Sequence, residues 1–354
     1  MKISKFPWVV QKEILRSMQL IELILLSFCS RKLRDFVENM MKWKSSKFEL
    51  IVYHCWSSDN TGIAITYKEG EFFLRIRVKS RIGDRIPIQM NFMGMDVQCC
   101  MPTESEECTL YCDEGKGEAI LQTVHNFLLS FIGLKTEYEL ITHCNYIPRL
   151  TNIRSSQQCI LDYKTAASQL SSFLSYSPFP EFLCLFATRG SNLENVPGLA
   201  ETQVLNYWID GSKGDEFLAN FKGRELHVYK GELSDSTVIQ FLNDWISNYG
   251  YQKLNVVRMT VDEECELHPE VIMSQCSFKQ FHSMDTFPIY RRTQRLRILP
   301  LVLNSCDFSS QFYIVRKSDG YVASVKVESK SLTFTAWNMN EKQFLEKHAN
   351  KMLQ

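Results

Sequence analysis

The first forty residues contain three short stretches in which apolar residues recur every three or four positions. This spacing over residues 8–18, 20–29 and 31–40 predicts three short helices, because such positions share one helical face. The middle stretch is apolar on two opposite sides, one formed by Leu20, Leu23, Ile24 and Phe28 and the other by Ile21, Leu25 and Cys29. A helix that is apolar all round is expected to be buried on both sides.

Three helices of this length cannot cover the middle helix on both of its sides. A unit of about 40 residues buries too little surface to be stable alone. Either a partner protein or the remainder of this chain must cover the second side. The pattern alone leaves both sources open.

The same apolar stretch is neither a signal peptide nor a membrane anchor by its pattern. Charged residues such as Lys12, Arg16 and Glu22 interrupt the segment, and no small-residue cleavage site follows Cys29. A spanning helix needs about 20 apolar residues, and this run has about half that number. We therefore expect no membrane association.

Residues 48–106 change to a strand pattern. The segments FELIVYHCW, GIAITYK and EFFLRIRVKS are rich in β-branched and aromatic residues and are separated by polar and glycine turns. We expect an antiparallel meander here, which IPIQMNF and DVQCCMP could extend.

From residue 107 the pattern alternates between strand and helix. The most regular helical stretch has apolar residues at i, i+3, i+4, i+7 and i+8, namely Val238, Phe241, Leu242, Trp245 and Ile246. Ser234 or Asp235 could cap it. Strand–helix–strand units imply parallel strands. Their irregular spacing favours a solenoid similar to leucine-rich repeats, with a single open α/β sheet as the alternative.

The carboxyl end returns to antiparallel pairing. Asp319-Gly320 between two alternating runs predicts a hairpin whose two central residues both have positive φ. Asn338 or Asn340 could cap a closing helix. The predicted fold class is therefore α+β: three helices over 1–43, a β-rich meander over 48–106, and a strand–helix–strand region over 107–354 closed by an antiparallel hairpin sheet.

Charge and cysteine content narrow the possible partners. Lys+Arg and Asp+Glu balance at 40 each among 354 residues, so bulk charge favours neither nucleic acid nor an anionic membrane. The twelve cysteines form no CxxC, and no histidine lies close to the Cys99–Cys112 cluster, so we expect no metal site. Reduced thiols are typical of a cytoplasmic or nuclear protein.

Enzyme motifs are absent from the sequence. There is no nucleophile elbow, phosphate-binding loop, dinucleotide fingerprint or zinc-protease helix, and the seven histidines are far apart. We expect neither catalysis nor a cofactor.

The amino-terminal segment FPWVVQKEILRSMQLIELILLSFCSRKLRDFV resembles an F-box. The aromatic-proline start at Phe6-Pro7, the E-I-L of the first helix and the L-S-x-C-S-[RK] ending stand in the order of that motif. The resemblance implies docking to a Skp adaptor held by a cullin scaffold. The expected docking residues are Phe6, Pro7, Val10, Ile14, Leu15, Leu20, Leu23, Leu26 and Cys29.

A second resemblance covers about residues 230–340. The motif F-L-N-x-W-I, the Lys-Leu strand after it, and R-x-x-D-G followed by a strand ending in Trp337 resemble the type 2 F-box-associated domain of nematode proteins. Residues 48–230 carry no resemblance of similar specificity.

Together the resemblances imply the substrate-recognition subunit of an SCF-type cullin-RING E3 ubiquitin ligase. Its F-box would bind the adaptor, and its carboxyl-terminal domain would bind a target protein. The alternative is a non-catalytic interaction scaffold without a ligase role, in which the F-box-like helices pack internally.

Overall fold

The computed structural model describes most of the chain. The described residues are 5–18, 20–29, 31–41, 48–68, 70–78, 88–92, 94–100, 107–143, 146–160, 163–178, 180–187, 193–281, 289–290 and 308–349. The chain divides into two compact units, one of residues 1–160 and 168–180, the other of residues 161–167 and 181–354. The first unit therefore holds the predicted helical segment, the whole 48–106 range and the start of the 107–354 range.

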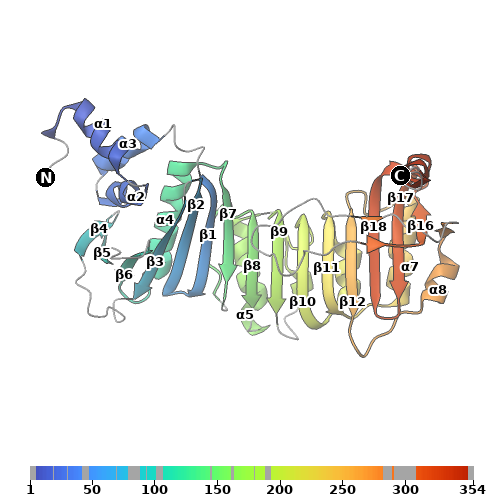
Figure 1. Cartoon of the computed structure of the whole chain (residues 1–354). Coiled ribbons are helices and arrows are strands. Elements are labelled where there is room, and N and C mark those ends of the chain that lie inside the picture. Colours follow the sequence, from blue (N-terminus) through green and yellow to red (C-terminus); the bar gives the residue numbers. More distant parts are fainter. Residues whose placement is uncertain are drawn as a thin grey trace. The chain divides into compact units, whose positions relative to one another are not determined.

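The first unit begins with the three predicted helices, α1 (Trp8–Ser17), α2 (Leu20–Cys29) and α3 (Arg31–Met41) (Figure 1). Pro7 precedes α1 at the N-cap position, where a residue without an N–H costs nothing. Leu23, Ile24, Leu25 and Phe28 of α2 are 1–6% exposed. The prediction that α2 is buried on both sides agrees with this burial, since Leu25 lies opposite Leu23 on the helix.

An eight-strand order follows in the first unit, β4-β5-β6-β3-β2-β1-β7-β8 (Figure 1). The strands are β1 (Phe48–Ser57), β2 (Asn60–Tyr67), β3 (Gly70–Val78), β4 (Ile88–Phe92), β5 (Met95–Cys100), β6 (Glu107–Cys112), β7 (Glu137–Thr142) and β8 (Ser155–Ile160). Strands β1, β2 and β3 pair antiparallel, so the predicted meander is confirmed for its first three strands.

The long helix α4 (Gly117–Ile132) covers one face of this sheet. Its His125 ring bonds to Tyr53 of β1, which fixes the odd-numbered residues of β1 on the helix side. Ile51, Tyr53 and Cys55 are accordingly fully buried, whereas His54 and Trp56 on the opposite face are only partly buried. This alternation is the period of a strand with one covered face.

The predicted strand–helix–strand unit of β6, α4 and β7 is present, but its two strands are not neighbours. Strand β6 pairs parallel to β3, and β7 pairs parallel to β1, so the whole meander lies between them. The reason is that β1, β2 and β3 already form a sheet with two free edges, and one strand joins each edge. The hairpin β4–β5 then joins β6 rather than β3.

The second unit has its own strand order, β9-β10-β11-β12-β18-β17-β16-β13 (Figure 1). Its elements include β9 (Phe182–Ala187), β10 (Val204–Ser212), α6 (Gly214–Asn220), β11 (Glu225–Gly231), α7 (Asp235–Ser247), β12 (Val256–Val261), α8 (Pro269–Gln275), β13 (Lys279–Gln280), β16 (Phe312–Val315), β17 (Tyr321–Glu328), β18 (Ser331–Asn340) and α9 (Glu341–Ala349). Strands β9 to β12 are parallel and adjacent in chain order, as the sequence predicted. The short pair β14 (Ile289–Tyr290) and β15 (Phe308–Ser309) stands apart from this order, and α5 (Tyr163–Tyr176) leads from β8 toward β9.

Helix α7 follows the sequence prediction closely. The Ser234 hydroxyl accepts a hydrogen bond from the Thr237 N–H, so Ser234 is the N-cap. The five apolar residues predicted to share its face are all buried. Phe241 and Trp245 meet the ring of Phe334 on β18 edge-on, at 5.1 and 5.4 Å between centroids, which seats the helix on the sheet.

The carboxyl-terminal hairpin of β16 and β17 is present, but its turn differs from the prediction. Only Gly320 has a positive φ, of 73°. The prediction that both central residues have positive φ is therefore wrong. The reason is a longer loop: Arg316 pairs with Tyr321 through the backbone, which leaves four residues between them and needs one left-handed position.

Helix α9 begins with a reciprocal cap. The Gln343 N–H donates to Asn340 Oδ1, and the Asn340 N–H donates to Gln343 Oε1. Of the two predicted caps, Asn340 is the one used. Among the residues that the structure describes, no helix has the length and apolar character needed to cross a bilayer.

Candidate functional site

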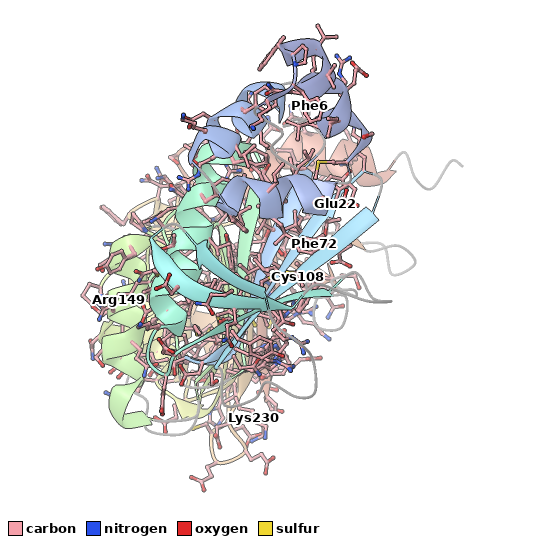
Figure 2. The ribbon with its side chains drawn as sticks, turned by 90° about the vertical axis from the view of Figure 1, so that its left-hand side faces the viewer. Phe6, Glu22, Phe72, Cys108, Arg149 and Lys230 are labelled. Carbon is pink, nitrogen blue, oxygen red and sulfur yellow. The ribbon has the colours of Figure 1, made fainter. Side chains whose placement is uncertain are left out.

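The first turn of α1 presents apolar side chains to solvent. Trp8, Val9 and Val10 are 56%, 68% and 41% exposed, and they follow one another directly. Figure 2 shows Phe6 at the outer end of this helix, away from the strands that carry Phe72 and Cys108. Consecutive exposed apolar residues at a helix start indicate a surface that another protein covers. We call Phe6, Pro7, Trp8, Val9 and Val10 the α1 patch.

Local hydrogen bonds hold the α1 patch in one conformation. The Gln11 side chain donates to the carbonyl of Phe6 at 2.6 Å, and the Gln11 N–H donates to the carbonyl of Pro7 at 3.0 Å. The Trp8 ring meets Phe36 of α3 edge-on, with 4.6 Å between centroids. This contact holds the Trp8 ring in place. Val9 and Val10, which follow it, are exposed to solvent.

Seven of the nine residues predicted to dock an adaptor fall into three environments, and the side chains of the other two are not described. Pro7 and Val10 are exposed, and Phe6, Ile14 and Leu26 are partly buried. Leu15 and Leu23 are 1% and 2% exposed. Leu20 and Cys29 lie in α2, but their side chains are outside the described residues. That these nine residues dock an adaptor stays a prediction.

Sequence reasoning missed Trp8 and Val9 as surface residues. Only one face of a short helix can enter a core, and here that face is taken by Ile14, Leu15 and Met18. Three consecutive apolar residues in the first turn cannot all share it. This excess of apolar residues was a signal that could have identified the α1 patch.

Helix α2 is covered by the chain itself. The Phe28 ring meets Phe127 of α4 edge-on, with 4.9 Å between centroids, and the Arg34 guanidinium lies 5.8 Å from the centroid of the same ring. The sequence left open whether a partner protein or this chain covers α2. In the structure, α4 of the same unit packs against Phe28 of α2. Among the described side chains of the three helices, the exposed large apolar ones are Trp8, Val9 and Val10 of α1.

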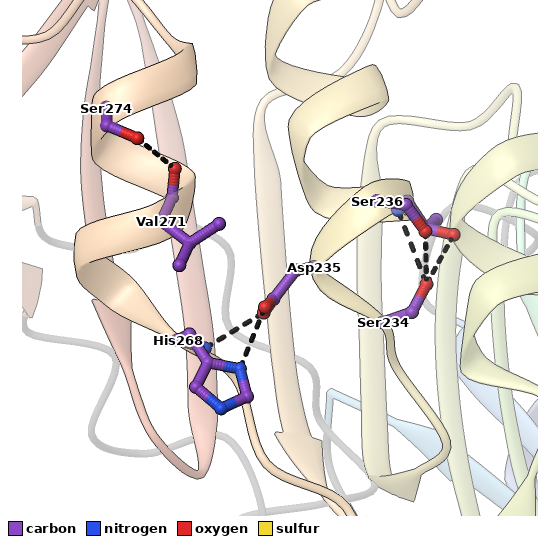
Figure 3. Close-up of polar contacts among 7 residues, drawn as sticks. Ser234, Asp235, Ser236, His268, Val271 and Ser274 are labelled. Atoms are coloured by element: carbon purple, nitrogen blue, oxygen red, sulfur yellow. Dashed lines mark hydrogen bonds and ion pairs between the residues drawn. The ribbon is translucent and has the colours of Figure 1, made fainter.

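The second unit contains a His–Asp pair that could suggest catalysis. The Asp235 carboxylate accepts from the His268 backbone N–H and meets His268 Nδ1, both at 2.9 Å (Figure 3). The Ser234 hydroxyl is directed elsewhere: it donates to Asp215 and lies 3.1 Å from the Ser236 hydroxyl. Among the described residues, the side-chain partner of His268 is Asp235, so the pair joins the starts of α7 and α8, and the Ser234 hydroxyl is not bonded to it.

The cysteine cluster of the first unit is buried. The Cys99 and Cys108 sulfurs are 3.6 Å apart, and hydrogen bonding between them lowers the pKa of Cys99. Cys112 directs its thiol to the carbonyl of Arg77. In the part of the chain that the structure describes, no group of three His, Cys, Asp or Glu side chains is arranged to hold a metal ion.

The comparison with protein families found one match. Residues 3–45 match the F-box domain, which includes α1, α2 and α3 and the whole α1 patch. No curated protein and no solved structure matches the chain. F-box proteins are generally non-catalytic adaptor-binding subunits, and the match indicates no enzyme family. The helices that leave the α1 patch open to solvent are thus an F-box domain.

Proposed function

We propose that this protein is the substrate-recognition subunit of an SCF-type cullin-RING E3 ubiquitin ligase. The observation that carries the proposal is an F-box domain whose first helix leaves apolar residues exposed. The F-box binds a Skp adaptor and, through it, a cullin scaffold. The region after residue 107 binds the target protein. The protein works in the cytoplasm, the nucleus or both, where the described buried thiols stay reduced.

The adaptor docks on the α1 patch. Val9 and Val10 are the anchors, because they are exposed in the free chain and are neighbours of the fixed Trp8 ring. Of the nine residues that the sequence suggests, Phe6, Pro7, Val10, Ile14 and Leu26 retain accessible surface. Leu15 and Leu23 are almost fully buried in the free chain, so they offer an adaptor no surface.

Such a subunit performs no bond chemistry. It raises the effective concentration of a target lysine beside a charged ubiquitin-conjugating enzyme. The geometry of the His268–Asp235 pair, which activates no serine, is in keeping with this role.

We further propose that residues 230–340 form a type 2 F-box-associated domain. Two features support this. The F-L-N-x-W-I motif supplies the buried Phe241, Leu242 and Trp245 of α7. The R-x-x-D-G motif supplies a clamp, in which the guanidinium of Arg316 holds the Asp319 carboxylate at 2.6–3.1 Å. The successive parallel strands β9 to β12 similarly support a likeness to leucine-rich repeats.

The alternative is an interaction scaffold without a ligase role. The contact between Phe28 and Phe127 favours it, because F-box helices that pack on the rest of the chain need no adaptor to be stable. The α1 patch favours the ligase subunit, because this internal packing leaves it exposed.

Binding of the full-length chain to a purified Skp adaptor tests the proposal. We expect a Val9→Glu, Val10→Glu double variant to bind about 100-fold more weakly in titration calorimetry, since each buried anchor is worth about 1–2 kcal/mol. Val271→Glu is the matched control, because Val271 is 44% exposed on α8 of the second unit. Unchanged affinity of the double variant, or an equal loss in the control, contradicts the proposal.

The same titration separates the two functions. If the unmodified chain does not bind the adaptor, the ligase role is wrong and the scaffold remains. If it binds, addition of the cullin scaffold must yield a ternary complex that elutes as one species.

A further inference from the structure

The sheet of the first unit carries a group of rings on the face opposite α4. His54 and Trp56 project from β1, Phe73 projects from β3, and His143 directly follows β7. All four are at least partly exposed. We call these four residues the ring platform. Their face follows from strand alternation, because Tyr53 and Cys55, on the other face, are sealed beneath α4.

Three of the four rings are nearly parallel. His54 and Trp56 have centroids 5.7 Å apart and planes 13° apart, and His143 lies 5.8 Å from Trp56 with planes 7° apart. The Phe73 ring is tilted against Trp56 by 53°, at 6.5 Å. Rings arranged this way offer a stacking surface for an apolar or aromatic side chain.

A glycine on the middle strand makes room for the platform. Gly62 of β2 pairs with His54 on one side and with Arg75 on the other. A Cβ atom at this position would collide with the Phe73 ring and lie 3.0 Å from Trp56 Cζ3. The rings therefore lie over the backbone of β2, where any larger residue would displace them.

Two guanidinium groups adjoin the rings. The Arg75 guanidinium lies 5.5 Å from the Trp56 centroid and 5.3 Å from that of Phe73, so both rings hold it against the sheet. Arg77 is two residues further along β3 and shares the same face. Its side chain makes no hydrogen bond or ion pair with the described residues, and its Nε is buried without a partner. The remaining N–H groups of a half-buried guanidinium can donate to an anionic group that binds from outside.

Arg75 and Arg77 bring two positive charges to this face, and Asp96 of β5, across β6 from Arg77, is an exposed acidic residue on it. Glu139 of β7 is on the same face but is 4% exposed, and Glu71 lies at the opposite end of β3 from Arg77. Burial, with a smaller contribution from His143, lowers the pKa of His54, so His54 is neutral at pH 7. The positive charge thus comes from Arg75 and Arg77.

We propose that the ring platform with Arg75 and Arg77 binds an extended acidic peptide segment, with carboxylates at alternating positions and an apolar or aromatic side chain beside them. Residues i and i+2 of a strand lie about 7 Å apart on one face, so carboxylates at alternating positions of an extended peptide match the two arginines. Each guanidinium can hold one carboxylate through two N–H groups. The neighbouring apolar side chain stacks on Trp56.

Other anionic partners fit the face less well. Single-stranded nucleic acid needs a row of cations along its backbone, and the described part of this face offers two, in a chain with no net charge. A phosphorylated peptide is an outcome of the test below, because one guanidinium can also hold a phosphate through two N–H groups. The inference goes beyond the proposed function and does not rest on adaptor binding.

Fluorescence polarisation with the full-length chain and no adaptor tests the proposal. The probe is a labelled decapeptide with Glu at alternating positions and one flanking Phe, measured against the same peptide with Gln in place of Glu. We expect the acidic peptide to bind at least about tenfold more tightly, and its affinity to fall as salt rises.

Three substitutions locate the binding site. Arg77→Gln and Trp56→Phe should each weaken binding, Arg77→Gln by about tenfold or more. Arg77→Lys, which keeps the charge but loses the planar fork, should fall between Arg77→Gln and the unmodified chain. Arg149→Gln removes an exposed arginine of the same unit and should change nothing (Figure 2). Circular dichroism confirms that each variant is folded.

Several results would overturn the proposal. One is equal affinity for the acidic and the Gln peptide, and another is an Arg149→Gln loss as large as that of Arg77→Gln. Tighter binding of a phosphoserine peptide without carboxylates, or of a single-stranded oligonucleotide, would assign the face to that partner instead.

Discussion

At the residue scale, the buried His125 has a hydrogen-bond partner on each of its ring nitrogens. His125 of α4 is 1% exposed and lies 2.8 Å from both the Tyr53 hydroxyl and the Thr151 carbonyl. A carbonyl can only accept, so Nε2 carries the proton, and Nδ1 accepts from Tyr53. Burial lowers the pKa of His125 from 6.5 to about 4. The ring is therefore neutral, and it joins the helix to the sheet and to the loop before β8.

This pKa makes the stability of the first unit depend on pH. In the unfolded chain His125 binds a proton near pH 6.5, and in the folded chain only near 4. Stability is fully present above pH 6.5 and falls as the pH drops toward 4, by at most about 3 kcal/mol. Urea unfolding between pH 7.5 and 4.5 measures this loss. His125→Gln, which can keep both hydrogen bonds, should show a shallower dependence. An unchanged slope in that variant would assign the dependence to other groups.

At the element scale, local sequence patterns predicted the helices and strands well, but they could not predict which strands pair when the partners are distant in sequence. Helix α7 follows from five apolar positions and a serine cap, and the parallel strands β9 to β12 follow from alternation with helices. The separation of β6 from β7 does not follow, because their neighbours β3 and β1 are set by contacts distant in sequence. The open side of α1 was missed for a different reason: a short helix buries one face only, and the apolar positions of its first turn do not show which face that is.

The hairpin clamp gives an element-scale prediction. Arg316 is 7% exposed, and its guanidinium lies 5.2 Å from the centroids of Trp245 and of Tyr321. Arg316→Gln removes the contact with Asp319 and should destabilise the second unit by about 2 kcal/mol. Thermal unfolding followed by tryptophan fluorescence measures the change. Arg316→Lys should recover only part of the loss, because an ammonium cannot make the two-nitrogen contact.

The pH dependence of the clamp has a definite sign. The Arg316 guanidinium holds the pKa of Asp319 below its usual 3.8. The stabilisation is therefore present above pH 3.8 and is lost as the pH falls below it. The unmodified chain should lose more stability than Arg316→Gln in this acid range. Equal losses in the two proteins would mean that Asp319 does not depend on Arg316.

At the scale of the whole molecule, the F-box is part of the first unit. Its α2 packs on α4 through Phe28 and Phe127, while its α1 leaves apolar residues open. One part of the F-box thus packs into the first unit, and we propose that the other part binds an adaptor. The sequence identified the F-box and the nine candidate residues, but a list of apolar positions could not separate the two groups, because burial depends on the partner element.

The packing of Phe28 on α4 predicts different effects of two substitutions in the first unit. Phe28→Ala removes a fully buried ring and should destabilise the first unit by about 3–4 kcal/mol in urea unfolding. Leu134→Ala, at a residue of the same unit that is 60% exposed, should change stability by less than about 0.5 kcal/mol. A loss from Phe28→Ala no larger than that of its control would show that α2 does not depend on α4.

The central claim is that the exposed start of α1 is where an adaptor binds. Hydrogen–deuterium exchange of the full-length chain, with and without a saturating Skp adaptor, tests it most directly. The account predicts slower exchange over residues 6–18 in the complex and unchanged exchange over 204–261. Equal exchange over residues 6–18 in the free and adaptor-saturated chain would contradict it.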